Sequence, residues 1–168
     1  ILADGLNVFS ELFGFRSASF IANNFIWDTE LDATLASNGV SILQGMKKQY
    51  LPAYYGKNRM SVGHRTGEVN KKGQLYMVRN CFFEPALIPA DPVRFCLSDI
   101  QNAFAWHKPA IITTHRLNFM GGIVPSNRDN NLEAFDNLLR NVTRKWPDAE
   151  FMTTVQLGEL IRQESHPE

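Results

Sequence analysis

The segment from Pro109 to Phe119 constrains the fold more than any other part of the sequence. Residues 110–114 are five consecutive apolar or β-branched residues, which is the length and composition of a strand buried on both faces. His115, Arg116 and Asn118 follow. In α/β proteins the carboxyl ends of parallel strands carry the working groups, and a histidine there can act as an acid, a base or a metal ligand. The alternative is that His115 only caps the strand by a hydrogen bond to the next loop.

Composition narrows the class of protein. A chain of 168 residues is long enough for one domain with a sizeable core, and we expect a single domain over residues 1–168. Its 17 basic and 17 acidic residues cancel, which argues against nucleic acid or an anionic membrane as the main partner. No apolar run approaches the roughly 20 residues that span a bilayer. Cys81 and Cys96 fit neither a disulfide framework nor a CxxC metal site.

The first residues, Ile-Leu-Ala-Asp-Gly, contain neither an initiator Met nor the basic and apolar regions of a signal peptide. We therefore expect the chain to be the later part of a longer protein. A cytoplasmic and an exported location both stay open.

Hydrophobic periodicity alternates between helix and strand along the chain. Apolar residues at helical spacing predict helices over 2–13, 28–37, 92–106 and 132–146, and a last one from 155. Short apolar runs predict strands over 18–22, 40–43, 75–79, 110–114 and 150–152. The segment between the two glycines at 121–122 and Asn131 is expected to be a flexible loop.

This alternation is typical of parallel βα units. It predicts an α/β fold whose βα units form either a partial or distorted (β/α) barrel, or one modest open sheet. An incomplete barrel exposes two strand edges. We expect an oligomer, a preceding segment or the long excursion described next to cover them.

Residues 45–74 form a long excursion without sustained periodicity. It contains a cluster of basic residues and tyrosines: Lys47, Lys48, Tyr50, Tyr54, Tyr55, Lys57, Arg59, His64 and Arg65. Such a surface can hold sugars or phosphates by stacking and hydrogen bonding; alternatively, this is a solvated loop whose tyrosines cover the sheet edge. His64, Glu68 and Asn70 form either a small polar site or local turns.

If the strands are parallel, their carboxyl ends bring polar and aromatic side chains to one opening, where His115 is the candidate catalytic residue. The candidate substrate-binding residues are Asn23, Asn24, Trp27, Glu84, Arg116 and Asn118. Planar polar groups beside an aromatic ring make a sugar-binding set. The sequence has no HxxxH or HExxH pair and no Asp-Asp dyad beside a strand end, so we expect no metal site built by this chain alone. Motifs for a serine nucleophile or a nucleotide phosphate are also missing.

Four segments together resemble a known family. They are residues 19–27 (SFIANNFIW), 39–45 (GVSILQG), 111–115 (IITTH) and 151–157 (FMTTVQL). Their order is similar to the C-terminal half of polysaccharide deacetylase-like proteins, in the glycoside hydrolase/deacetylase superfamily of distorted (β/α) barrels. The resemblance implies that His115 protonates the leaving amine when an N-acetyl group is hydrolysed, and that Asn23, Trp27 and Arg116 hold the sugar.

The chain also departs from this family. The family's Asp pair and its two metal-binding histidines would lie before Ile1, so the zinc-like divalent metal that the resemblance implies belongs to a longer parent protein. Where the family has an arginine and prolines, this chain has Ile21, Ala22 and Asn23. The expected function is therefore a carbohydrate-active hydrolase that is inactive in this piece alone. The alternatives are a non-catalytic carbohydrate-binding or interaction module, and a phosphate-ester binder that uses the basic excursion.

Overall fold

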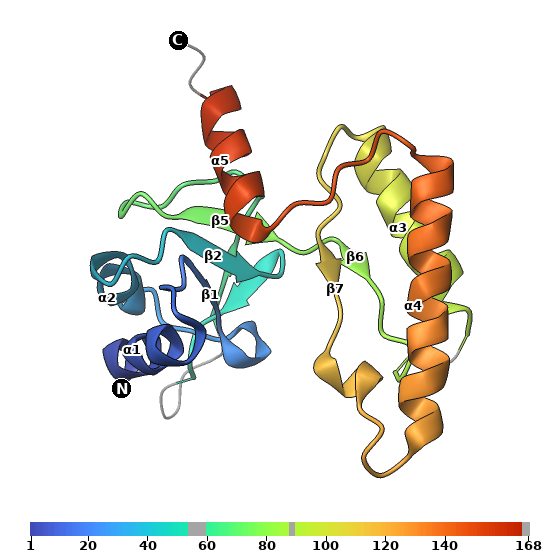
Figure 1. The fold of residues 1–168 in the computed structure, drawn as a ribbon. Coiled ribbons are helices and arrows are strands. Elements are labelled where there is room, and N and C mark those ends of the chain that lie inside the picture. The colour runs from blue at the N-terminus through green and yellow to red at the C-terminus, as the bar shows by residue number, and fades with distance from the viewer. Residues whose placement is uncertain (54–59, 88–89, 166–168) are drawn as a thin grey trace. The chain divides into compact units, whose positions relative to one another are not determined.

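The computed structural model describes residues 1–53, 60–87 and 90–165. These residues form two compact units (Figure 1). Unit 1 comprises Ile1–Val78 and Met152–Glu168, and unit 2 comprises Arg79–Phe151. The hydrophobic core clusters of the two units have no residue in common.

Unit 1 is built on a parallel sheet. Its strands are β1 (Ser19–Ile21), β2 (Ile42–Gly45) and β5 (Leu75–Val78), in the order β1-β2-β5. The chain crosses from β1 to β2 through the short helix α2 (Leu31–Ser37). This is the strand, helix and strand arrangement that parallel pairing requires.

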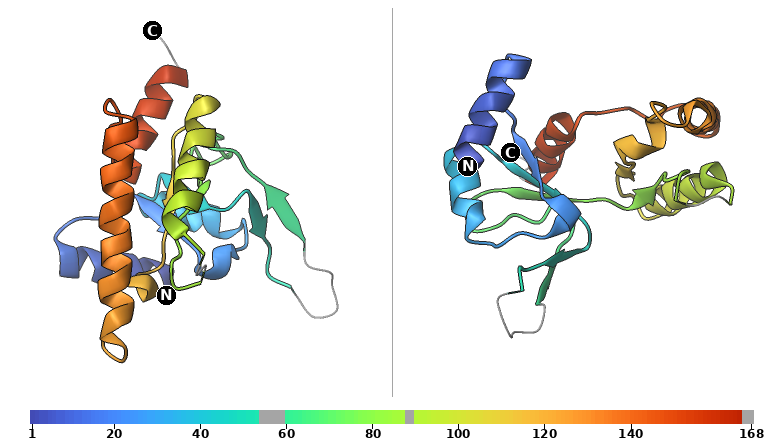
Figure 2. Two further views of the ribbon diagram at one scale, coloured as in Figure 1. Left: turned by 90° about the vertical axis from the view of Figure 1, so that its right-hand side faces the viewer. Right: turned by 90° about the horizontal axis from the view of Figure 1, so that it is seen from below.

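Helices cover both faces of this sheet. Successive residues of a strand point to opposite sides, so neighbouring residues of β2 contact helices on different faces. Leu43 packs in a buried cluster with Leu35 of α2, and Leu2 and Leu6 of α1 (Leu2–Phe13) lie against that cluster. Ile42, its neighbour in β2, faces α5 (Thr154–Ser165). The view from below shows α1 and α2 on one side of the sheet and α5 on the other (Figure 2).

The excursion contains a second, antiparallel pair of strands that the sequence did not predict. In it, β3 (Lys48–Tyr50) pairs with β4 (Ser61–Gly63). Strands of three residues are too short for an alternating pattern to stand out. The predicted contributions of Tyr54, Tyr55, Lys57 and Arg59 fall outside the residues that the structure describes.

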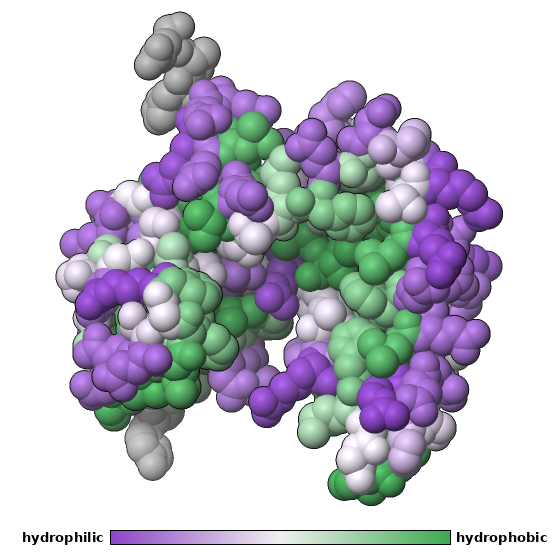
Figure 3. All heavy atoms as spheres, viewed as in Figure 1, coloured by the Kyte–Doolittle hydropathy of each residue, from purple (hydrophilic) through white to green (hydrophobic). Residues whose placement is uncertain are grey.

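Unit 2 packs two helices against a pair of short parallel strands. Its elements are β6 (Cys81–Phe82), α3 (Pro92–Ala105), β7 (Ile112–Thr113), the 3-10 turn η2 (Arg116–Phe119) and α4 (Pro125–Lys145). β6 pairs with β7, with Phe82 opposite Thr113. The core includes Phe83, Ile100 and Leu138, all at most 1% exposed. Hydrophilic residues cover the outer side of α4 (Figure 3).

Most of the predicted helices are confirmed, and their end signals explain why. α1 ends where Gly14 adopts a left-handed φ of 74°, a conformation that glycine allows at little cost. α3 begins after Asp91, whose side chain accepts a hydrogen bond from the backbone N–H of Arg94 at 3.0 Å. A hydrogen bond of this kind from an Asp side chain caps the amino end of a helix.

Two of the predicted elements are wrong, and a third is shorter than predicted. Residues 150–152 form no strand and are exposed. The strand predicted over 110–114 is reduced to Ile112–Thr113, and only Thr113 in that run is buried. The expected flexible loop before Asn131 is largely helical, because α4 begins at Pro125, and proline's fixed φ favours the first helical position.

The chain is an α/β protein with parallel strand pairs in both units. None of the helices within the described residues is both long and apolar enough to cross a membrane.

Candidate functional site

Parallel pairing in unit 2 brings His115 and Glu84 together. Each residue lies two positions after the end of its strand, Glu84 after β6 and His115 after β7. Because β6 and β7 are parallel neighbours, their carboxyl ends lie at the same edge of the pair. There Nδ1 of His115 lies 2.7 Å from Oε1 of Glu84.

The two partners of this hydrogen bond differ sharply in exposure. The Glu84 side chain is 7% exposed, whereas that of His115 is 63% exposed. An ionised carboxylate can only accept hydrogen bonds, so Nδ1 of His115 donates and the neutral ring carries its lone pair on Nε2. A histidine held in this way can take up or deliver a proton at Nε2.

Asn118 holds the other side of the carboxylate. Its Nδ2 donates to Oε2 of Glu84 at 2.8 Å, while its Oδ1 accepts from the backbone N–H of Ala86 at 3.0 Å. Asn118 is only 1% exposed. Both carboxylate oxygens of Glu84 therefore have hydrogen-bond partners, and the carboxylate is fixed before any ligand arrives.

A pair of asparagines on α4 fixes the turn that carries Asn118. Asn131 donates from Nδ2 to the backbone oxygen of Asn118 at 2.7 Å, and Asn127 donates to the backbone oxygen of Leu117 at 3.1 Å. Neither residue was expected at a site, because the segment before the predicted helix at 132 has the composition of a loop. Their spacing of four, which puts two side chains on one face of a helix, was the available signal.

Arg79 is a further residue that the sequence pattern did not mark as part of a site. Burial lowers the pKa of its guanidinium group, and the negative charge of Glu84 opposes that effect. Glu84 thus lies in the field of a half-buried cation as well as next to His115. Arg116, which was predicted to bind substrate, is exposed on η2.

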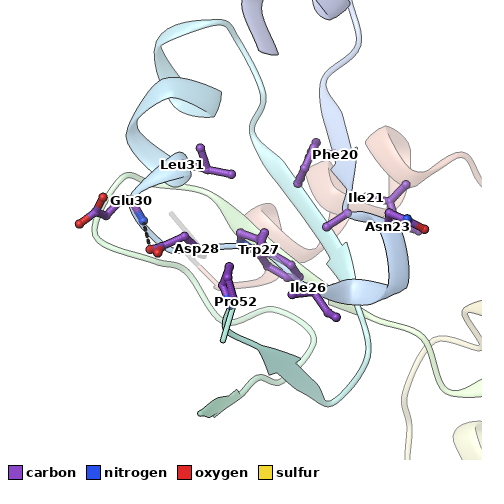
Figure 4. A pocket seen from close by; sticks show the side chains of 10 residues that line it. Phe20, Ile21, Asn23, Ile26, Trp27, Asp28, Glu30, Leu31 and Pro52 are labelled. Atoms are coloured by element: carbon purple, nitrogen blue, oxygen red, sulfur yellow. Dashed lines mark hydrogen bonds between the residues drawn. The ribbon is translucent and has the colours of Figure 1, made fainter. Parts of the chain in front are cut away.

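The other predicted residues, Asn23, Asn24 and Trp27, lie in unit 1 after the end of β1. The side chains of Asn23 and Trp27 line a hollow of about 500 Å³, whereas Asn24 is not among its lining residues (Figure 4). Trp27 is only 3% exposed. Asn24 and Phe25 both have left-handed φ angles, 51° and 56°, which are unusual for residues other than glycine.

His64 is buried in unit 1 and does not belong to an exposed basic surface. It is 6% exposed, its Nε2 lies 2.8 Å from Oε1 of Gln49, and its ring stacks on Tyr76 with centroids 3.7 Å apart. Glu68 lies 3.7 Å from Nδ1 of His64 and also accepts from the backbone N–H of Arg65 at 3.0 Å. The predicted group around His64 thus combines a local turn with a buried polar cluster.

Within the described part of the chain, no group of three or more His, Cys, Asp or Glu residues is placed to hold a metal ion. The divalent metal that the family resemblance implies therefore does not fit the described residues.

The chain was compared with protein-family models, curated proteins and solved structures. No family model, no curated protein and no solved structure matches the chain.

Proposed function

We propose that this chain supplies proton transfer in the hydrolysis of an N-acetyl group on a carbohydrate, with His115 as the catalytic residue. The hydrogen bond of 2.7 Å between the exposed His115 and the nearly buried Glu84 is the observation that supports this function most directly. After water has added to the acetyl carbon, His115 protonated at Nε2 would deliver a proton to the departing nitrogen, so that the C–N bond breaks and the amine and acetate are released. Without that proton an amine is a very poor leaving group.

Glu84 acts in this proposal as a positioning residue rather than a substrate ligand. Its carboxylate orients the imidazole through Nδ1 and stabilises the positive charge that His115 carries before it gives up the proton. The fold proposed with this function is a partial or distorted (β/α) barrel. Its support is the parallel pairing of strands within each unit and the resemblance of the four sequence segments to the deacetylase family.

Acetate release from an N-acetylglucosamine tetramer tests the proposal. The protein should be expressed with all the residues that its gene encodes, and zinc should be supplied. We expect His115→Ala to lower kcat by about 10²-fold to 10⁴-fold and Glu84→Gln to lower it by about 10-fold to 100-fold. Glu133→Gln, an exposed position on α4, is the matched control and should leave kcat unchanged.

A second readout separates positioning from general damage to the fold. The nitrogen NMR resonances of the His115 ring report which nitrogen carries the proton, and we expect the Nδ1–H form in the wild type. Glu84→Gln should weaken that preference while leaving the circular dichroism spectrum unchanged. Acetate release that persists in His115→Ala would overturn the proposal. Tetramer binding without any acetate release would replace it with the carbohydrate-binding alternative.

A further inference from the structure

The strands of unit 2 give the His115–Glu84 pair little support by themselves. β6 and β7 are two residues long, and they pair with each other at two positions. A ladder of this length holds the chain beyond it weakly. Nevertheless, His115 and Glu84, each two residues beyond a strand, lie 2.7 Å apart. Their pairing therefore depends on contacts outside the ladder.

The side chain of Asn118 joins the two strand ends. Beyond β6, its Nδ2 lies 2.8 Å from Oε2 of Glu84, and its Oδ1 accepts from the backbone N–H of Ala86 at 3.0 Å. Beyond β7, the same Nδ2 lies 2.9 Å from the backbone oxygen of His115 and 3.2 Å from Oγ1 of Thr114. A residue that is 1% exposed thus bonds to both segments.

These contacts also fix which way round the amide of Asn118 lies. A backbone N–H only donates, so the atom that faces Ala86 is the amide oxygen, and the NH₂ group faces Glu84. An NH₂ group requires an acceptor opposite it. We infer that Asn118 is a positioning residue for His115. By holding one oxygen of Glu84, it turns the other toward the Nδ1 proton of His115.

This inference deepens the proposed function, in which His115 delivers a proton from Nε2, and its kinetic test rests on that function. Its spectroscopic test rests on the contacts among Asn118, Glu84 and His115 and needs no catalysis. The inference and the proposed function can therefore fail separately.

Exchanging the amide and the carboxylate between positions 84 and 118 tests the inference. In Glu84→Gln, the NH₂ group of Asn118 should draw the glutamine oxygen toward itself. The glutamine NH₂ group then faces Nδ1 of His115, and the ring proton moves to Nε2. Adding Asn118→Asp should reverse this arrangement, because the new carboxylate attracts the glutamine NH₂ group. The glutamine oxygen then faces His115, and the proton returns to Nδ1.

The nitrogen NMR resonances of the His115 ring measure this exchange at about pH 9, where imidazole is neutral. We expect the Nδ1–H form in the wild type, a shift toward Nε2–H in Glu84→Gln, and Nδ1–H again in the double variant. Glu84→Gln with Asn137→Asp is the matched control, because Asn137 is an exposed residue of α4, and it should behave like Glu84→Gln. A double variant with the same ring form as Glu84→Gln would overturn the inference.

Acetate release from the N-acetylglucosamine tetramer is a second measurement, which does not require the double variant to fold. Asn118→Ala should lower kcat by about 10-fold to 100-fold and leave KM unchanged, because Asn118 is buried and acts through Glu84. Asn137→Ala is the control and should keep the wild-type kcat.

A wild-type kcat in Asn118→Ala would also overturn the inference. If the wild type itself released no acetate, the proposed function would fail instead, and the His115 ring resonances would decide the inference alone.

Discussion

Single residues show most clearly how this chain uses buried polar groups. His64 in unit 1 is stacked on Tyr76 and 6% exposed, with Glu68 and Asp32 as the nearby acids. Burial lowers the pKa of His64 below its usual 6.5, and the two acids offset this only in part. Nδ1 of His64 has no hydrogen-bond partner among the described residues, whereas Nε2 is bound to Gln49. The folded protein therefore favours the neutral ring.

This preference makes stability depend on pH. Below about pH 6.5 the unfolded chain takes up a proton at His64 that the folded chain does not bind, so the free energy of unfolding falls as the pH is lowered from there to the folded pKa. The slope from one such group is at most about 1.4 kcal/mol per pH unit. Urea unfolding of the wild type and of His64→Gln between about pH 7.5 and 5 checks this. We expect the stability lead of the wild type over the variant to shrink as the pH falls.

Asp32 also makes the free energy of unfolding depend on pH. The test of His64 therefore uses the difference in that free energy between the wild type and His64→Gln. Burial raises the pKa of Asp32 above 3.8, and its hydrogen bonds from Trp27 and Asn70 only partly oppose that effect. The folded chain therefore keeps a proton that the unfolded chain loses as the pH rises above about 3.8, and the free energy of unfolding falls in that window. Asp32 is present in both proteins, so its contribution cancels from the difference apart from its electrostatic interaction with His64. A constant difference across the whole range would refute the role given to His64.

At the scale of elements, amphipathic helices could be predicted and short strands could not. α1 and α3 present many apolar positions at one period. α1 ends at Gly14 and α3 begins after the capping residue Asp91, so local sequence is sufficient. β6 has two residues, and no period can be detected over that length. Glu84 was nevertheless grouped with His115, because it was placed beyond the strand that precedes β6. The contact between Asn118 and Glu84 depends on the positions of η2 and α4, which local sequence does not specify.

A close approach between α5 and the sheet yields a test at this scale. A Cβ atom at Gly158 would lie 2.7 Å from Cδ1 of Ile42, whose residue is 2% exposed, and 3.5 Å from Cε of Met77. We expect Gly158→Val to lower the free energy of unfolding by about 1–3 kcal/mol through overpacking. Gly5→Ala in α1, where no atom lies within 4 Å, should raise it by up to about 1 kcal/mol.

Denaturant unfolding of both variants beside the wild type measures these changes. Both variants replace a helical glycine with a larger residue, but the space around the two glycines differs. A Gly158→Val variant as stable as the wild type would contradict the close packing of α5 against Ile42.

At the scale of the whole molecule, each unit has its own hydrophobic core. Leu35 belongs to the cluster of unit 1 and Leu138 to that of unit 2, and both are fully buried. Both leucines are apolar positions of helices that the periodicity predicts, over 28–37 and 132–146. The periodicity did not divide them between two cores, because the division depends on contacts between residues far apart in the sequence. Such contacts leave no trace in local spacing.

Because the clusters share no residue, truncating one core should loosen its own unit first. We expect Leu35→Ala and Leu138→Ala each to cost about 2–5 kcal/mol. Amide hydrogen exchange should speed up in α2 and β2 for the first variant and in α3 and α4 for the second. Leu12→Ala, at a side chain that is 73% exposed, should change the free energy of unfolding by no more than about 0.5 kcal/mol. Equal loss of protection in both units for either core variant would mean that the two cores unfold as one.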